Sequence, residues 1–439
     1  MARTMSKSVV LALALATLLP ARAALAQAIP SSGRFSLFAN WSQRDPVEGE
    51  SYDFSELIAT LSFYSDRRAD TTFEYGLDTR VATYPSSEAR DERVSIYEAW
   101  IGLKASEGRF KLRVGQMWLR DLGGLGSVGG LWGEYRSAKV SSFGQFRFGL
   151  YGGLEPKIRE AGYVDDIVKG GVYIAVDGDH GRRHVLGWTM IRNDDLTERS
   201  VITFNNFIPV ARKFFLYQGL QYDTQGPAGL GDSQLSYFFT NIRYAPIRLV
   251  EFQGTYHRGR SINARSITDD VLDGRPVTPE RLNGLLFESG RLRVTLNPWR
   301  RVRLWVGYGR DRNNRDDEWN DRVDYGFSVN DILGVGFDLT ASNSRIDRLD
   351  TEYDSTYVSL GKTLGRRVYL SLDYNTSLSV FHYSDGDGGY IELRPESERW
   401  SLSMNANISR LFSLLLVAEF MDHDDFEEVR ALTGLTFRF

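Results

Sequence analysis

Residues 368–374 read VYLSLDY, and residues 400–408 read WSLSMNANI. In both stretches apolar and polar side chains alternate at every second position, which is the period of a β-strand whose two faces meet different surroundings. The same alternation occurs at residues 109–114 and 322–329. Such runs extend over roughly 10–13 residues, the length that a tilted strand needs to cross a membrane. Strands of soluble sandwiches usually have only about 5–6 residues.

The composition agrees with a membrane barrel better than with a soluble core. The chain has 439 residues, of which 13 % are aromatic, with 22 Tyr, 25 Phe and 9 Trp, yet its mean hydropathy is -0.32. That hydropathy excludes a helical membrane bundle. The absence of Cys excludes a disulfide scaffold, a thiolate metal site and a self-attached c-type haem. A net charge of -4 excludes a general nucleic-acid binder.

The first 26 residues have the pattern of a Sec signal peptide. Arg3 and Lys7 precede an apolar run at residues 9–19, which is too short to span a bilayer, and residues 24–26 read ALA, a small-x-small cleavage signal. We therefore expect residues 1–26 to be removed. Residues 27–439 are then expected to form a single exported domain.

The strand runs continue to the last residue, and short turns alternate with longer polar connections such as residues 259–283. Because an unpaired backbone group costs several kcal/mol in hydrocarbon, a sheet that crosses a membrane must close on itself. We predict an all-β, antiparallel up-and-down transmembrane barrel of about 22 strands, with a range of 16–24. An even number places both termini on one side, and we expect that side to be the periplasm.

The C-terminus carries the most specific signal. Leu435, Phe437 and Phe439 are apolar residues at every second position, and Phe439 is the last residue. With the signal peptide, this ending resembles Gram-negative outer-membrane β-barrels of the porin type. The resemblance implies a cell outer-membrane location, contact with outer-membrane lipid and lipopolysaccharide, and recognition of this terminal assembly signal by the barrel-assembly machinery.

The aromatic residues are predicted to form belts at the two membrane interfaces, where amphipathic rings are favoured. The predicted belt residues, which fall near strand ends, are Trp41, Tyr64, Trp118, Tyr256, Trp299, Tyr308, Tyr374 and Phe420.

The opposite face of each strand is predicted to line the lumen. The lumen-lining set is Glu74, Asp78, Arg80, Glu98, Arg113, Glu134, Arg136, Arg147, Glu251, Arg291, Arg293, Arg303, Arg322, Asp324, Asp338 and Asp373. One hypothesis places four of these arginines (Arg113, Arg291, Arg293 and Arg303) on one wall, facing an acidic wall (Glu74, Asp78, Asp338 and Asp373). Separated charges would create a transverse field that orients polar solutes. The alternative is that the charges pair and solvate the wall.

Residues 112–136, LRVGQMWLRDLGGLGSVGGLWGEYR, contain the most distinctive loop. Glycine permits close backbone approach, and the leucines of this loop need cover from water. Two interpretations follow: the loop folds into the lumen as a constriction, or it packs on neighbouring loops at the rim.

The leading functional hypothesis is a channel for small polar solutes. The first alternative is a structural sheath around a periplasmic or lumenal multihaem cytochrome in an electron conduit. The second is an export or assembly barrel. No catalytic residues, metal ligands or cofactor are predicted, because the five His residues form no ligand pair on one strand face and no G-x-S-x-G motif occurs.

Overall fold

The computed structural model describes residues 31–65, 72–86, 90–105, 107–139, 144–157, 160–211, 213–314, 318–348, 351–384 and 390–439. The predicted signal peptide lies outside these residues.

The described residues form 23 strands, two α-helices and three 3-10 helices. In chain order the strands are β1 (Ser31–Pro46), β2 (Tyr52–Ser65), β3 (Phe73–Thr83), β4 (Arg93–Ala105), β5 (Phe110–Trp118), β6 (Ser127–Arg136), β7 (Gln145–Pro156), β8 (Tyr163–Asp177), β9 (Arg183–Asn193), β10 (Leu196–Val210), β11 (Phe214–Gln225), β12 (Gln234–Ile247), β13 (Val250–Ser261), β14 (Leu285–Trp299), β15 (Val302–Asn313), β16 (Asn320–Ile332), β17 (Phe337–Asp347), β18 (Thr351–Leu364), β19 (Val368–Ser384), β20 (Tyr390–Leu393), β21 (Glu396–Ala406), β22 (Phe412–His423) and β23 (Phe426–Arg438). The helices are η1 (Arg120–Leu125), η3 (Asp179–Gly181), η4 (Pro227–Gly229), α2 (Ala264–Leu272) and α3 (Pro279–Asn283).

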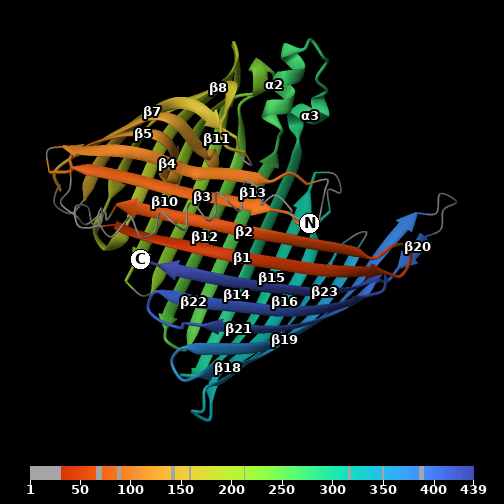
Figure 1. The fold of residues 1–439 in the computed structure, drawn as a ribbon. Coiled ribbons are helices and arrows are strands. Elements are labelled where there is room, and N and C mark those ends of the chain that lie inside the picture. The colour runs from red at the N-terminus through yellow and green to blue at the C-terminus, as the bar shows by residue number, and fades with distance from the viewer. Residues whose placement is uncertain are drawn as a thin grey trace, which may run out of the picture.

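The strands form one closed antiparallel barrel (Figure 1). Except at β20, each strand pairs with its neighbours in the chain, and β1 also pairs with β23, which closes the sheet. The short β20 pairs with the end of β19, whose remaining length pairs with β21. The barrel wall therefore has 22 strands plus one extra short strand. The predicted up-and-down barrel of about 22 strands is confirmed.

The closing seam joins the two ends of the described chain. Gly33 and Phe439 exchange two backbone hydrogen bonds of 2.9 and 3.0 Å. The Phe439 ring lies where a Cβ on Gly33 would stand, so glycine is needed at this close approach. Because Arg34 is opposite Arg438 in the register, both ends lie at the same end of the barrel. The assembly-signal residues thus belong to the seam: Leu435 is opposite Leu37, and Phe437 is opposite Phe35.

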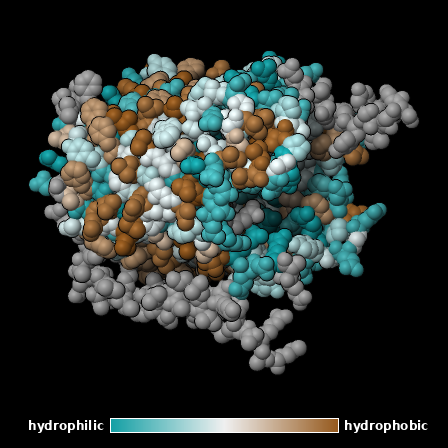
Figure 2. All heavy atoms as spheres, turned by 90° about the horizontal axis from the view of Figure 1, so that it is seen from above, coloured by the Kyte–Doolittle hydropathy of each residue, from teal (hydrophilic) through white to brown (hydrophobic). Residues whose placement is uncertain are grey.

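The two faces of each strand differ as a membrane barrel requires. On β9, Leu186 and Trp188 are 49 % and 40 % exposed, whereas Val185 and Thr189 on the other face are 2 % and 0 % exposed. The same pattern recurs around the wall: large apolar side chains stay exposed on the outer face, and many polar ones are buried on the inner face. Figure 2 shows apolar side chains gathered over one part of the surface and polar ones around a hollow in another. An apolar exterior and a polar interior suit a sheet that is surrounded by lipid.

Most of the predicted aromatic belt lies on the exposed face. Trp41, Trp118, Trp299, Tyr308 and Phe420 are among the exposed large side chains. Tyr374 is partly buried and packs on the outward Trp400 ring at 4.5 Å. Tyr256 is also partly buried, with its ring 5.9 Å from Phe238.

The prediction for Tyr64 was wrong. Its hydroxyl donates a 2.8 Å hydrogen bond to the Glu98 carboxylate, so it lies on the lumen face. The hydroxyl makes this side chain more favourable beside a carboxylate than in lipid.

The connections at one end of the barrel are longer than those at the other. The longest described one joins β13 to β14 and contains α2 and α3, which stand beyond the strand ends in Figure 1. Helix α2 packs on β9, β10 and η4. No helix in the described ranges is long and apolar enough to cross a membrane.

Candidate functional site

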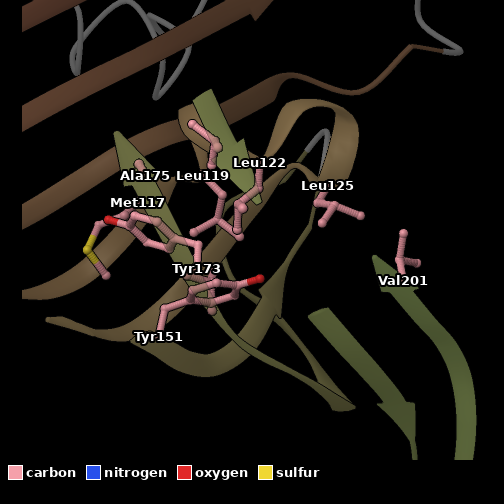
Figure 3. Packing of buried hydrophobic residues seen from close by; sticks show 10 residues of the cluster. Met117, Leu119, Leu122, Leu125, Tyr151, Tyr173, Ala175 and Val201 are labelled. Atoms are coloured by element: carbon pink, nitrogen blue, oxygen red, sulfur yellow. The ribbon is translucent and has the colours of Figure 1, made fainter. Parts of the chain in front are cut away.

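The loop between β5 and β6 folds into the barrel. Its leucines are almost fully buried, with Leu122 only 1 % exposed, and they pack on inward side chains of the wall that include Tyr173, Val185 and Val201. Figure 3 shows Leu119 and Leu122 close to the Tyr173 ring. The Leu122 side chain occupies the space that a Cβ on Gly187 of β9 would need, so glycine at position 187 makes room for the loop. The loop therefore folds into the lumen, as the first of the two interpretations predicts.

Glycine allows the backbone of η1 to make this inward turn. Gly123 has a φ of 67°, in the left-handed region that other residues rarely adopt. The loop is also held by a hydrogen bond of 2.9 Å from the Asn205 side chain to the Asp121 carbonyl. The sequence signal for this geometry is the glycine-rich run between two strands.

A buried ion network fixes η1 to the wall. The Arg147 side chain is 3 % exposed and contacts three carboxylates, at 2.7 Å to Asp121, 2.8 Å to Glu134 and 2.6 Å to Asp177. Arg183 bridges Asp121 and Asp177 from the other side, at 3.1 and 2.9 Å. A buried charge is tolerated only when it is paired and hydrogen-bonded, so Arg147 and its partners hold one another in place.

A second anchor lies on β4. Arg120 of η1 pairs with Glu98 at 3.0 Å, and the same carboxylate accepts the Tyr64 hydroxyl. The loop is thus tied to β4 on one side and to β7, β8 and β9 on the other.

A third anchor joins η1 to the outer helix. Lys169 donates to the carbonyls of Leu125 and Ser127 at 2.8 and 3.2 Å, and its ammonium lies 3.7 Å from Glu155. Glu155 also accepts from Arg265 on α2 at 3.1 Å. A continuous line of polar contacts therefore connects α2 to the constriction.

Arg265 also pairs with Glu198 at 2.5 Å. Burial lowers the pKa of Arg265, but the hydrogen bond that Arg265 donates to Glu198 and the charges of Glu198 and Glu155 outweigh it, so its pKa lies above the ordinary value. The guanidinium of α2 therefore stays charged wherever the barrel is folded.

The wall beside η1 carries a group of cations around one carboxylate. Glu74 pairs with Lys104 at 3.0 Å, Lys111 at 3.6 Å and Arg113 at 3.0 Å. The Arg113 guanidinium lies 4.0 Å from the Trp100 ring centre and 4.8 Å from that of Trp132, in cation–π geometry. Nearby, Arg136 pairs with Glu134 at 2.6 Å. All of these groups except Lys104 line a cavity of about 370 Å³ next to η1.

The wall from β14 to β16 is more open. Asp324 binds two arginines of β14, Arg291 and Arg293, with 2.7 Å to Arg293. Arg303 is exposed, and the Nε atom of Arg322 is buried without a hydrogen-bond partner among the described residues. This wall has more arginine than carboxylate.

The remaining predicted lumen residues make local contacts. Two of them form ion pairs: Arg80 with Glu56 at 3.3 Å, and Glu251 with Arg243 at 2.6 Å. The other three accept hydrogen bonds: Asp78 from the Tyr64 hydroxyl at 3.4 Å, Asp338 from the Asp331 backbone N–H at 2.8 Å, and Asp373 from the Tyr357 hydroxyl at 2.9 Å.

The hypothesis of separate basic and acidic walls is wrong. Arg113 is bound to Glu74, and Arg291 and Arg293 are bound to Asp324, so opposite charges share the same wall. Pairing lowers the free energy of charges that are partly removed from water. Local ion pairs are therefore more favourable here than two separated walls of like charge.

Sequence reasoning placed Glu98 and Glu134 on the lumen face but missed three other groups that hold η1, which are Asp121, Asp177 and Lys169. Asp121 lies in a loop, where strand alternation gives no side-chain direction. Lys169 and Asp177 lie on β8 and were not included in the predicted lumen-lining set.

Two cavities lie on opposite sides of η1. The loop-side cavity, about 540 Å³, is lined by η1, by β10 to β14 and by Ala264 of α2. The turn-side cavity, about 590 Å³, extends to the β8–β9 turn at Gly178. Both are lined by Gly123, Asn205 and Tyr217, which therefore lie between the two cavities.

Comparison with known proteins finds no matching family model and no matching curated protein. Among solved structures the chain is similar to OpdL of Pseudomonas aeruginosa, with 10 % identity, a TM-score of 0.44 and coverage of 93 % of this chain and 99 % of that chain. It is also similar to OpdQ of the same organism, with 8 % identity, a TM-score of 0.42 and coverage of 93 % of this chain and 98 % of that chain. For OccAB4 of Acinetobacter baumannii the identity is 12 % and the TM-score is 0.40, with coverage of 93 % of this chain and 98 % of that chain. The likeness is distant, so the function proposed for this chain rests on its own geometry.

Proposed function

We propose that this barrel is a channel for small polar solutes in the outer membrane. A closed sheet with an apolar exterior satisfies its backbone in lipid, and a charged interior provides a wet path. The observation that carries the proposal is the constriction: η1 narrows the lumen through fixed contacts, and cavities remain on both sides of it. A fixed constriction with space on either side is what a size-limiting channel requires.

The orientation follows from the connections. Both ends of the described chain lie at the end of the barrel that carries the shorter turns. Transmembrane barrels have short periplasmic turns and longer outer loops. We therefore place the short turns in the periplasm and the α2–α3 segment at the cell surface.

The geometry favours a channel over a sheath for a multihaem cytochrome. Barrels of 22 strands enclose a lumen that is normally plugged. Here η1 occupies part of the lumen, and its buried ion network would have to be broken to admit a protein partner. No observation favours an export or assembly barrel.

The test is the conductance of the purified chain in planar lipid bilayers, together with liposome swelling in small polar solutes. We expect discrete conductance steps and a swelling rate that falls with solute size. Electrically silent insertion, confirmed by protease protection of the reconstituted barrel, would contradict the channel function. Co-purification of a haem-staining band with such a silent barrel would favour the sheath instead.

A further inference from the structure

The loop-side cavity differs chemically from the rest of the lumen. One side carries rings on three neighbouring strands: Tyr217 on β11, Tyr237 on β12 and His257 on β13. The Tyr237 and His257 ring centres are 5.5 Å apart, and Phe287 on β14 continues the row 5.8 Å from His257. The register places these residues on the face opposite the outward Phe238 and Tyr256. The result is a continuous aromatic wall.

The same cavity is rich in neutral amides. Gln221, Gln225 and Gln234 line it, and their side chains make no hydrogen bond to other described residues. Each amide offers two donor hydrogens and an acceptor oxygen. The imidazole of His257 is similarly without a hydrogen bond in the described parts of the chain.

Of the two arginines that line the cavity, Arg199 is neutralised by a carboxylate, whereas Arg260 is bound only to a neutral carbonyl. Arg199 donates to both oxygens of Asp223, at 2.8 and 3.1 Å, and Arg260 donates to the carbonyl of Asn283 at 2.8 Å. The neighbouring β14–β16 wall, in contrast, holds two arginines on one aspartate. An anionic solute therefore finds one arginine without a carboxylate partner here, Arg260, but two arginines that share a single aspartate on the β14–β16 wall.

We propose that the loop-side cavity is a binding site for a neutral pyranose sugar of one or two rings, a proposal that rests on the channel function above. The flat C–H face of such a ring packs on aromatic side chains, and its many hydroxyl groups match several free amides. An aromatic hydrocarbon would leave those amides unpaired, which costs free energy. The volume of about 540 Å³ lies in the usual range of roughly 300–1,000 Å³ for small-molecule pockets.

The position of the site also gives it a purpose. Tyr217 lines both this cavity and the turn-side cavity. A sugar bound to the aromatic wall would stand at the entrance to the constriction. Binding would raise its local concentration there and select it over acyclic solutes of similar size.

The experiment measures maltose binding by the full-length barrel in two ways. In planar bilayers we expect maltose to reduce the current in a saturable way, and sorbitol, an acyclic polyol, to produce no saturable block. In detergent micelles we expect saturation-transfer NMR signals from maltose and none from sorbitol. The Tyr237→Ala and His257→Ala variants should each raise the half-blocking concentration about 3–10-fold, the effect of losing one aromatic contact.

The matched control is Phe238→Ala, since Phe238 neighbours Tyr237 on the same strand but faces outward. It should leave maltose block unchanged. A Gln221→Leu/Gln234→Leu variant tests the amides without removing a ring and should also weaken the block. Folding of each variant is checked by its heat-dependent migration on gels.

The two proposals can fail separately. A barrel that conducts ions but gives neither maltose block nor an NMR signal overturns the sugar site and leaves the channel intact. A barrel that gives the NMR signal but no conductance supports the sugar site and overturns the channel. Equal responses to maltose and sorbitol would also overturn the sugar site.

Discussion

The wall from β3 to β10 and the wall from β14 to β18 carry similar inward charges in different surroundings. In the first, Arg147 and Glu134 are 3 % and 1 % exposed and belong to a network that encloses η1. In the second, Arg291 and Arg293 are about one-third exposed and share one aspartate. Burial makes the first set a structural element that fixes the constriction. Exposure leaves the second set free to act on ions in the lumen.

The largest effect is expected where the buried network is broken. Arg147→Met would leave three carboxylates without their shared cation, and breaking a buried pair costs about 3–5 kcal/mol. We expect a lower unfolding midpoint in urea for the barrel in lipid–detergent mixtures. The control is Arg345→Met, which removes an exposed pair with Glu352 at 3.3 Å and should cost about 0–1 kcal/mol. Equal shifts for the two variants would show that burial does not distinguish the two regions.

The next effect concerns the packing of η1. Leu122→Ala would remove buried methyl groups from the hydrophobic cluster and should cost about 2–5 kcal/mol. Since this contact holds the constriction in the lumen, we also expect larger single-channel conductance and faster liposome swelling. Leu333→Ala is the control, because Leu333 is 92 % exposed in a turn. An unchanged conductance in a folded Leu122→Ala barrel would argue that η1 does not limit the path.

The smallest effect is expected at the open wall. Asp324→Asn would release Arg291 and Arg293 and remove one negative charge from the lumen, so the reversal potential in a KCl gradient should shift toward anion selectivity. The shift should shrink between 0.1 M and 1 M salt, as the Debye length falls from about 10 to 3 Å. Asp347→Asn, at the end of β17, is the control for a charge change away from this wall. A shift that is the same at both salt concentrations would contradict screening in an open lumen.

Much of the fold could be predicted from local sequence. Alternation at every second residue, as in β19 and β21, directly shows which side chains share a face. The closed form follows because unpaired backbone groups are costly in hydrocarbon. Side-chain partners were harder to predict, because they depend on register. A bulge shifts the pairing between Asp78 and Thr79, so strict alternation fails on β3 and β4.

The candidate site was predictable only in part. The glycine- and leucine-rich loop indicated that a constriction was possible, but its anchors come from five other strands. Arg147 and Asp121 are 26 residues apart, and Asn205 is 84 residues from Asp121. Contacts of this kind form only when the whole sheet is closed, and no short segment of the sequence predicts them. The aromatic wall of the loop-side cavity likewise appears only when four strands are placed in register.

The β1–β23 seam has a consequence for how the molecule is made. Apart from β19–β21, whose connection contains β20, the other strand pairs of the described barrel wall join consecutive strands, whereas Ser36 and Thr436 meet across 400 residues. The sheet can therefore grow one hairpin at a time, but its two free edges persist until the final strand arrives. Open edges template aggregation, and distant pairings form slowly. The intermediate most prone to aggregation is thus a nearly complete sheet with two open edges. Pairing of β1 with β23 as the last step converts it into a closed barrel.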